Sequence, residues 1–346
     1  MTKFDPYPLP KFEETTSTLY GSRYFTTLDC FPGFHQVSIK EEDKEKTGFT
    51  VPFGHYEFNR LPFGLSNSPS NFQRLMDMVL KNLTGVQCWV FDDIIIFSES
   101  AEEHALRLEN VLQRFDNANL QLHPGKCEFA KSQVQYLGFR LSEDGVAASA
   151  DKVKAVREYP TPKNAKDVRA FLGLASFYRR LVQNFAEVAK SLSILIRKDQ
   201  NFIWGPSQQE AFEDLKNRLS TTPVLAYPNF ELPFILTTDA SKVAVAAILS
   251  QVQDGVEKPI AYASRQLNKA EQSYAASENE MLAVVWATKY FRCYLYGKKF
   301  LVRTDHSALT YLRNFTENNS RLLRRSLKLS ELDFTVEHRA GTKIPM

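Results

Sequence analysis

Residues 24–36 read Tyr-Phe-Thr-Thr-Leu-Asp-Cys-Phe-Pro-Gly-Phe-His-Gln, and residues 88–98 read Cys-Trp-Val-Phe-Asp-Asp-Ile-Ile-Ile-Phe-Ser. Their β-branched and aromatic residues predict a strand at 24–29 and a hairpin within 86–98. Asp29 ends the first strand, and Asp92 and Asp93 interrupt the second run. Charged side chains in such runs are costly to desolvate unless they are paired or bind a cation. These two stretches therefore predict a sheet that carries functional carboxylates.

Asp92 and Asp93 would lie at the tip of the hairpin. Adjacent carboxylates repel each other and tend to raise one pKa, and a divalent cation removes that conflict. Phosphoryl-transfer enzymes hold two metal ions at such sites. A solvated hairpin turn is the alternative, because Asp is a common turn residue.

The remainder of the chain separates into three regions by pattern. Residues 1–145 combine short strands with helices and predict an α+β domain with antiparallel strands. Its expected elements are a hairpin at 48–61, a helix from Ser66 to Leu83, a helix opened by the capping box Ser100–Glu103, and strands at 126–129 and 134–141. Residues 146–228 are mainly helical, with a second capping box at Ser207–Glu210. The third region, 229–346, mixes strands with a long helix expected at 274–296.

A second set of carboxylates lies in this third region. Asp239 ends a strand, Glu280 lies on the long helix, and Asp305 ends the strand at 300–304. Acids from two strand ends and one helix can converge at one edge of a sheet, where they would bind Mg²⁺ through oxygen ligands. Two bound metals could activate water against a phosphodiester. The alternatives are helix N-caps for Asp239 and Asp305, and a solvated helix position for Glu280.

Composition sets weaker bounds on function. The 346 residues carry 43 basic and 40 acidic side chains, a net charge of +3 that does not by itself predict a nucleic-acid partner. The four cysteines form no CxxC pair, which disfavours a zinc site or a disulfide framework. There is no signal pattern and no apolar run of transmembrane length, so we expect no membrane association. An intracellular location is the default, with cytoplasm and nucleus left open.

Five ordered motifs carry a resemblance to a known family. Residues 24–36, Leu61–Gln73, Phe91–Ser98, His123–Phe129 and Tyr136–Phe139 resemble the reverse transcriptase motifs of gypsy-type long-terminal-repeat retrotransposons. The order strand-Asp239, helix-Glu280, strand-Asp305 resembles the ribonuclease H domain of the same polyproteins. The resemblance implies a reverse transcriptase palm with partial fingers at 1–145, a helical thumb or connection at 146–228, and a ribonuclease H-like mixed α/β domain at 229–346.

The resemblance also implies roles for single residues. Asp29, Asp92 and Asp93 would be catalytic metal ligands for RNA-directed DNA polymerisation, and Asp239, Glu280 and Asp305 for RNA-strand hydrolysis, each site with two Mg²⁺ or Mn²⁺ ions. Phe34 would be the steric gate against ribose 2′-hydroxyls, with a plain core aromatic as the alternative. Gln73 would bind substrate, and Lys126 would lie near the leaving pyrophosphate unless it is an ordinary solvated lysine.

The implied partners are an RNA template, a DNA primer, an RNA–DNA hybrid, deoxynucleoside triphosphates and other parts of the polyprotein. The sequence departs from the family pattern at three places. Phe91 directly precedes Asp92, where the family has one more residue. The upstream fingers strands and the last acidic ribonuclease H motif fall outside 1–346, so we expect a chain truncated at both ends. A degenerate or domesticated, non-catalytic nucleic-acid-binding fragment is therefore the alternative function.

Overall fold

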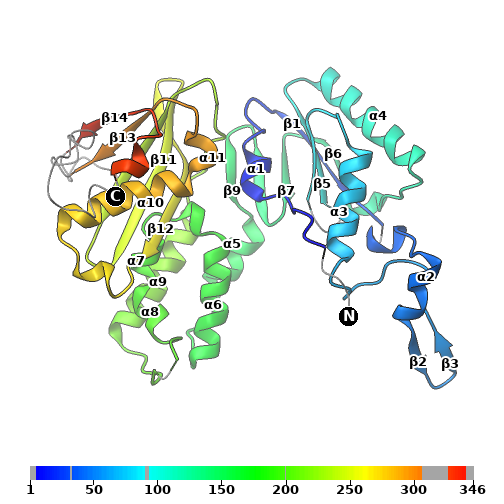
Figure 1. Cartoon of the computed structure of the whole chain (residues 1–346), viewed down its shortest axis with the longest axis horizontal. Coiled ribbons are helices and arrows are strands. Elements are labelled where there is room, and N and C mark those ends of the chain that lie inside the picture. Colours follow the sequence, from blue (N-terminus) through cyan, green and yellow to red (C-terminus); the bar gives the residue numbers. More distant parts are fainter. Residues whose placement is uncertain (1–4, 32, 90–92, 199, 306–325, 340–346) are drawn as a thin grey trace. The chain divides into compact units, whose positions relative to one another are not determined.

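The structure, a computed structural model, describes residues 5–31, 33–89, 93–198, 200–305 and 326–339 (Figure 1). It divides into two units, Met1–Gly145 and Val146–Met346. The first unit mixes helices with antiparallel strands, and the second joins helices to a mixed sheet. The α+β class expected from the sequence is thus confirmed.

Strand β1 lies inside a four-stranded sheet of order β4-β5-β1-β6 in the first unit. The strands of this sheet are β1 (Tyr24–Asp29), β4 (Val86–Trp89), β5 (Asp93–Ser98) and β6 (Glu128–Lys131). β1 runs antiparallel to β5 in a continuous register from Tyr24 opposite Ser98 to Asp29 opposite Asp93. This pairing places the two predicted acids side by side at one end of the sheet.

Two helices cover one face of this sheet, α3 (Ser68–Val79) and α4 (Ala101–Asn117). Leu28 and Ile94 pack against Phe72 of α3 and Val111 of α4 in one buried cluster. Because side chains alternate between the faces of a strand, Asp29 and Asp93 project to the face away from these helices. The helices therefore support the acids from behind without covering them.

Local signals set the ends of several elements in this unit. The predicted capping box is found in half: the Ser100 hydroxyl accepts a hydrogen bond of 3.2 Å from the Glu103 amide, whereas the Glu103 carboxylate accepts one from the Glu99 amide rather than from Ser100. The single strand predicted at 134–141 is wrong. It is a hairpin of β7 (Gln133–Tyr136) and β8 (Phe139–Ser142), whose turn residues Leu137 and Gly138 have φ values of 52° and 80°. The other elements are α1 (Phe12–Thr16), η1 (Gly33–Gln36), α2 (Glu41–Lys44), η2 (Glu45–Thr47), β2 (Phe49–Val51), β3 (Gly54–Tyr56) and η3 (Pro124–Lys126).

A five-stranded sheet of order β12-β11-β10-β13-β14 is the centre of the second unit. Its strands are β10 (Phe234–Ala240), β11 (Ala244–Gln253), β12 (Val256–Gln266), β13 (Phe300–Thr304) and β14 (Phe334–His338). β10, β11 and β12 form an antiparallel meander, whereas β13 joins β10 in parallel and β14 joins β13 in parallel. Helix α10 (Ala276–Tyr290) packs on β10 and β11, and their contact forms a large buried apolar cluster.

Helices precede this sheet in the chain. They are α5 (Ala150–Arg157), α6 (Ala165–Phe177), η4 (Arg179–Leu181), α7 (Phe185–Val188), α8 (Lys190–Ile194) and α9 (Pro206–Ser220), and strand β9 (Gly145–Ala148) lies before them. Phe171 of α6 and Phe212 of α9 pack with tilted rings whose centroids lie 4.7 Å apart, and Trp204 meets Phe212 edge-on. η4 and α7 pack against β12, where the Ala186 amide donates a hydrogen bond to the Ser264 hydroxyl.

Two helix boundaries differ from the prediction. α9 begins at Pro206 rather than after Ser207, because Gln208 accepts a hydrogen bond from the Gly205 amide and so caps the helix two residues earlier. The long helix predicted to reach Tyr296 ends at Tyr290. A separate short helix, α11 (Arg292–Leu295), follows the buried Phe291. The 3-10 helix η5 (Glu271–Ser273) precedes α10. The break lets Tyr294 and Leu295 turn into the core.

Candidate active sites

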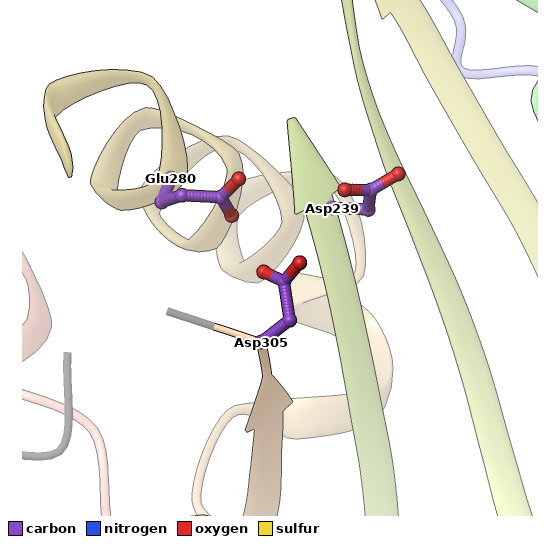
Figure 2. Close-up of side chains that lie close together, drawn as sticks. All are labelled: Asp239, Glu280 and Asp305. Carbon is purple, nitrogen blue, oxygen red and sulfur yellow. The ribbon is translucent and has the colours of Figure 1, made fainter. Parts of the chain in front are cut away.

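The three acids of the second unit come from neighbouring elements. β10 and β13 are parallel, with Phe234 opposite Phe300 and Thr237 opposite Arg303. The same register carries Asp239 and Asp305 to the same end of the two strands. α10 crosses this end and presents Glu280 from the side (Figure 2). The predicted convergence of strand, helix and strand is therefore found in the structure.

Their geometry is that of a small carboxylate cluster. One oxygen from each of Asp239, Glu280 and Asp305 lies within 4.8 Å of the others. Asp239 is half-buried inside β10, where it pairs with Ala246, so the alternative of a helix N-cap is wrong. Glu280 is 6% exposed, which excludes the solvated helix position. Asp305 is exposed at the end of β13, and the residues directly after it lie outside the described ranges.

Burial and mutual repulsion make the charged forms of these acids unfavourable without a cation. Burial, followed by the nearby charges of Asp305 and Asp239, raises the pKa of Glu280 to about 8. Burial and the Asp305 charge also raise the pKa of Asp239, and the exposed Glu187 of α7 adds to that effect. Raised pKa values of this kind are typical of sites at which a bound ligand balances the charge of the acids.

The donor set fits a divalent cation. Three carboxylates supply only hard oxygen ligands, which suit cations such as Mg²⁺ and Mn²⁺. Glu280 Oε2 is buried and has no hydrogen-bond partner among the described residues. A buried carboxylate oxygen is rarely left in that state, so a coordinated ion would satisfy it. The described residues at this edge can therefore hold a divalent metal.

We expect the stability of the metal-free protein to depend on the Glu280 proton. The folded pKa of about 8 lies above the ordinary value of 4.5, so the folded state keeps a proton that the unfolded state releases. The contribution of this group to the free energy of unfolding is complete below pH 4.5 and is lost as the pH rises to about 8. Urea unfolding in EDTA across this range, compared with Glu280→Gln, measures it. If the free energy of unfolding changes with pH equally in the two proteins, the prediction is contradicted.

The acids of the first unit lie on adjacent strands. Asp29 and Asp93 face each other across the β1–β5 pair, and Lys126 Nζ lies 3.4 Å from Asp29 Oδ1. Burial and the Asp29 charge raise the pKa of Asp93, while Lys126 lowers it. Asp93 is a half-buried strand residue, which argues against a solvated turn at this position. Asp92, predicted as its partner, lies outside the described residues.

The other predicted site residues of the first unit are Phe34, Gln73 and Lys126, and their surroundings differ from one another. Phe34 is 4% exposed and packs on Phe63 and Phe72, as its core alternative expected, and its role as a steric gate stays a prediction. Gln73 is buried on α3 and donates hydrogen bonds to Asp77 and to the Cys88 carbonyl. Lys126 is largely exposed apart from its contact with Asp29.

Sequence reasoning missed several neighbours of these acids. The Tyr136 hydroxyl donates a hydrogen bond of 3.3 Å to the Asp93 carbonyl. Arg303, two residues before Asp305, is a buried cation that pairs with Glu257 and Glu337. A detectable signal existed for Arg303, because it interrupts the apolar run Phe-Leu-Val of a buried strand. Tyr136 belongs to the motif Tyr136–Phe139, but nothing in that motif indicates a contact with Asp93.

Two family models match the chain. Residues 1–141 match the reverse transcriptase (RNA-dependent DNA polymerase) family, and residues 204–302 match the RNase H-like domain found in reverse transcriptase. The chain therefore belongs to the reverse transcriptases that carry an RNase H-like domain.

Curated relatives show which kind of reverse transcriptase the chain is similar to. The chain is 43% identical over 339 residues to the retrovirus-related Pol polyprotein from transposon 297 of Drosophila melanogaster, covering 97% of this chain and 32% of the relative. It is 39% identical to the Pol polyprotein from transposon gypsy of the same organism, covering 97% of this chain and 34% of the relative. The resemblance to gypsy-type Pol polyproteins is thus confirmed, and the chain spans about a third of the length of these relatives.

Solved structures share the fold. The foamy viral protease-reverse transcriptase dRH in complex with double-stranded DNA has a TM-score of 0.86 at 23% identity, over 97% of this chain and 60% of that one. The foamy viral protease-reverse transcriptase in complex with an RNA/DNA hybrid has a TM-score of 0.84 at 23% identity, over 99% of this chain and 48% of that one.

Across the described ranges, every helix lacks the length and apolarity that a bilayer crossing requires.

Proposed function

We propose that this chain copies RNA into DNA at the Asp29–Asp93 end of the first sheet and cleaves the RNA strand of RNA–DNA hybrids at Asp239, Glu280 and Asp305. The observation that carries the proposal is the second cluster, whose three carboxylates converge within 4.8 Å. Two of its acids, Asp239 and Glu280, lie within residues 204–302, which match the RNase H-like domain found in reverse transcriptase. The solved relatives bound to double-stranded DNA and to an RNA/DNA hybrid support nucleic acid as the partner.

At the nuclease site, Asp239, Glu280 and Asp305 would hold Mg²⁺. The bound cation supplies Lewis acidity, which lowers the pKa of water and stabilises charge on the phosphodiester. Glu280 must lose its proton before it can act as a ligand, and its position on the packed face of α10 keeps the carboxylate fixed. Asp305 is the exposed member and lies where a phosphate could reach the cluster.

At the polymerase site, Asp29 and Asp93 would hold Mg²⁺ together with Asp92. Asp29 and Asp93 lie on the sheet face that α3 and α4 leave uncovered, so a primer and template would have access. Lys126, close to Asp29, supplies a cation beside the position of a triphosphate. Phe34 would limit the space for a ribose 2′-hydroxyl, and Gln73 would support the substrate position. Deoxynucleoside triphosphates are the implied second substrate.

Two assays on the whole chain test this function. The first is extension of a DNA primer on an RNA template with Mg²⁺, and the second is cleavage of the labelled RNA strand in an RNA–DNA hybrid. Activity in both, abolished by EDTA, is expected. Hybrid binding without either activity would favour the non-catalytic alternative and overturn the enzymatic proposal.

A further inference from the structure

Arg303 is a cation buried in the centre of a sheet. It lies on β13, is 5% exposed, and donates hydrogen bonds through Nη1 to both oxygens of Glu257, at 2.9 and 3.0 Å, and through Nε to Glu337 at 2.9 Å. The Ser250 hydroxyl adds a hydrogen bond of 2.8 Å to Glu257. A buried charge needs such partners, because the loss of one leaves an uncompensated ion. Two carboxylates thus flank this guanidinium, and Glu337 Oε1 also lies 3.8 Å from Arg339 Nε.

The position of Arg303 brings it close to the proposed metal site. It pairs with Thr237 of β10, and each of these residues precedes an acid of the cluster, Asp305 or Asp239, by two positions. Side chains two residues apart project to the same face of a strand, about 7 Å from each other. An unattached arginine at this position could therefore turn to the cluster and pair with its acids.

The ion pairs with Glu257 and Glu337 direct the Arg303 guanidinium away from the acid cluster. Glu257 is opposite Val252 of β11, and the preceding residue Gln251 is opposite Phe234, the first residue of β10. Glu257, on β12, is therefore level with the beginning of β10, with β11 between them, whereas Asp239 lies near the end of β10. Arg303 must extend back along the sheet to reach Glu257, which carries its charge away from the acid cluster.

We propose that Glu257 and Glu337 are positioning residues of the nuclease site, which hold Arg303 away from Asp239 and Asp305 and so keep these carboxylates available to a divalent cation. The inference rests on the proposed function of the cluster as a metal site. Without the two glutamates, Arg303 competes with the cation for the same oxygens. The glutamates themselves do not touch the metal.

The test is Mn²⁺ binding to the whole chain, followed by the electron paramagnetic resonance signal of free Mn²⁺. Because the Asp29–Asp93 site could also bind Mn²⁺, binding at the cluster is taken as the part that Asp239→Asn removes. Glu257→Gln with Glu337→Gln is expected to weaken binding about tenfold, equivalent to about 1.4 kcal/mol. Adding Arg303→Met to this double variant is expected to restore binding, since the competing cation is gone. A purely structural role would instead make the triple variant at least as weak as the double variant, and that result would overturn the proposal.

Controls separate the possible failures. Asp254→Asn removes the carboxylate of the exposed ion pair with Lys258 and is expected to leave Mn²⁺ binding unchanged. If Asp239→Asn binds as much Mn²⁺ as the wild type, the proposed function of the cluster fails. If the wild type binds and the double variant binds equally well, only the role of the glutamates fails. Should the double variant not fold, Glu337→Gln alone, at a side chain 42% exposed, is expected to shift binding in the same direction, and no shift would overturn the proposal.

Discussion

Asp239→Asn is expected to lower cleavage of the RNA strand by about 10²–10³-fold, the usual consequence of removing one preorganised electrostatic group from an active site. Asparagine keeps the shape of the side chain but loses the charge that a divalent cation needs. The Asp239 carboxylate is half-buried, belongs to a continuous strand and repels Asp305. The measurement is the single-turnover rate on a labelled RNA–DNA hybrid at saturating Mg²⁺.

The same substitution is expected to stabilise the metal-free protein. Burial and the Asp305 charge raise the pKa of Asp239, so its ionised form costs free energy in the folded state at neutral pH. Removal of that charge also lowers the pKa of Glu280 from about 8 towards its ordinary range. Urea unfolding in EDTA measures the gain, with Asp254→Asn as the control. Full cleavage activity in Asp239→Asn would contradict the assignment of this acid.

Asp29→Asn is expected to lower primer extension by at least about 10²-fold while RNA cleavage stays at the wild-type rate. Asp29 contributes its carboxylate beside Asp93, and its backbone carbonyl separately accepts a hydrogen bond from His123. The backbone contact survives the substitution, so the strand is expected to keep its place. Primer extension and hybrid cleavage on the same preparation measure the two activities.

A loss of primer extension without a loss of RNA cleavage is the informative outcome for Asp29→Asn. Asp43→Asn, at a carboxylate that is 46% exposed and paired with Lys46, is the matched control and is expected to leave extension unchanged. Equal loss of both activities in Asp29→Asn would point to misfolding or to a shared site. Unchanged extension would exclude Asp29 from the polymerase chemistry.

Much of the fold was predictable because local chemistry and tertiary packing agree. The apolar run of β1 and the Ser100 cap of α4 each give a clear local signal, and both elements lie where the sequence predicts. The placement of Asp239, Glu280 and Asp305 was predictable from the rule that acids at strand ends meet at one edge of a sheet. Their burial was not, because it depends on how closely α10 packs on β10.

Other features depend on contacts that no local pattern contains. A leucine with positive φ is unusual, so the turn at Leu137 has no strong sequence signal besides Gly138. At the start of α9, two capping signals overlap, and the one that includes Pro206 prevails. The partners of Arg303 are 46 and 34 residues away in sequence, and only the complete sheet brings them together.

The parallel pairing of β13 with β10 has a consequence for the order in which the protein matures on the ribosome. The acids of the first unit, Asp29 and Asp93, and the strand β6 beside them all lie within the first 131 residues. The nuclease acids meet only after β13 has emerged and inserted next to β10, with β14 as its outer neighbour. Because domains generally fold as units from the N-terminus during synthesis, the first site can be assembled while the second is still incomplete. A nascent chain would therefore bring the acids of the proposed polymerase site together before those of the proposed nuclease site.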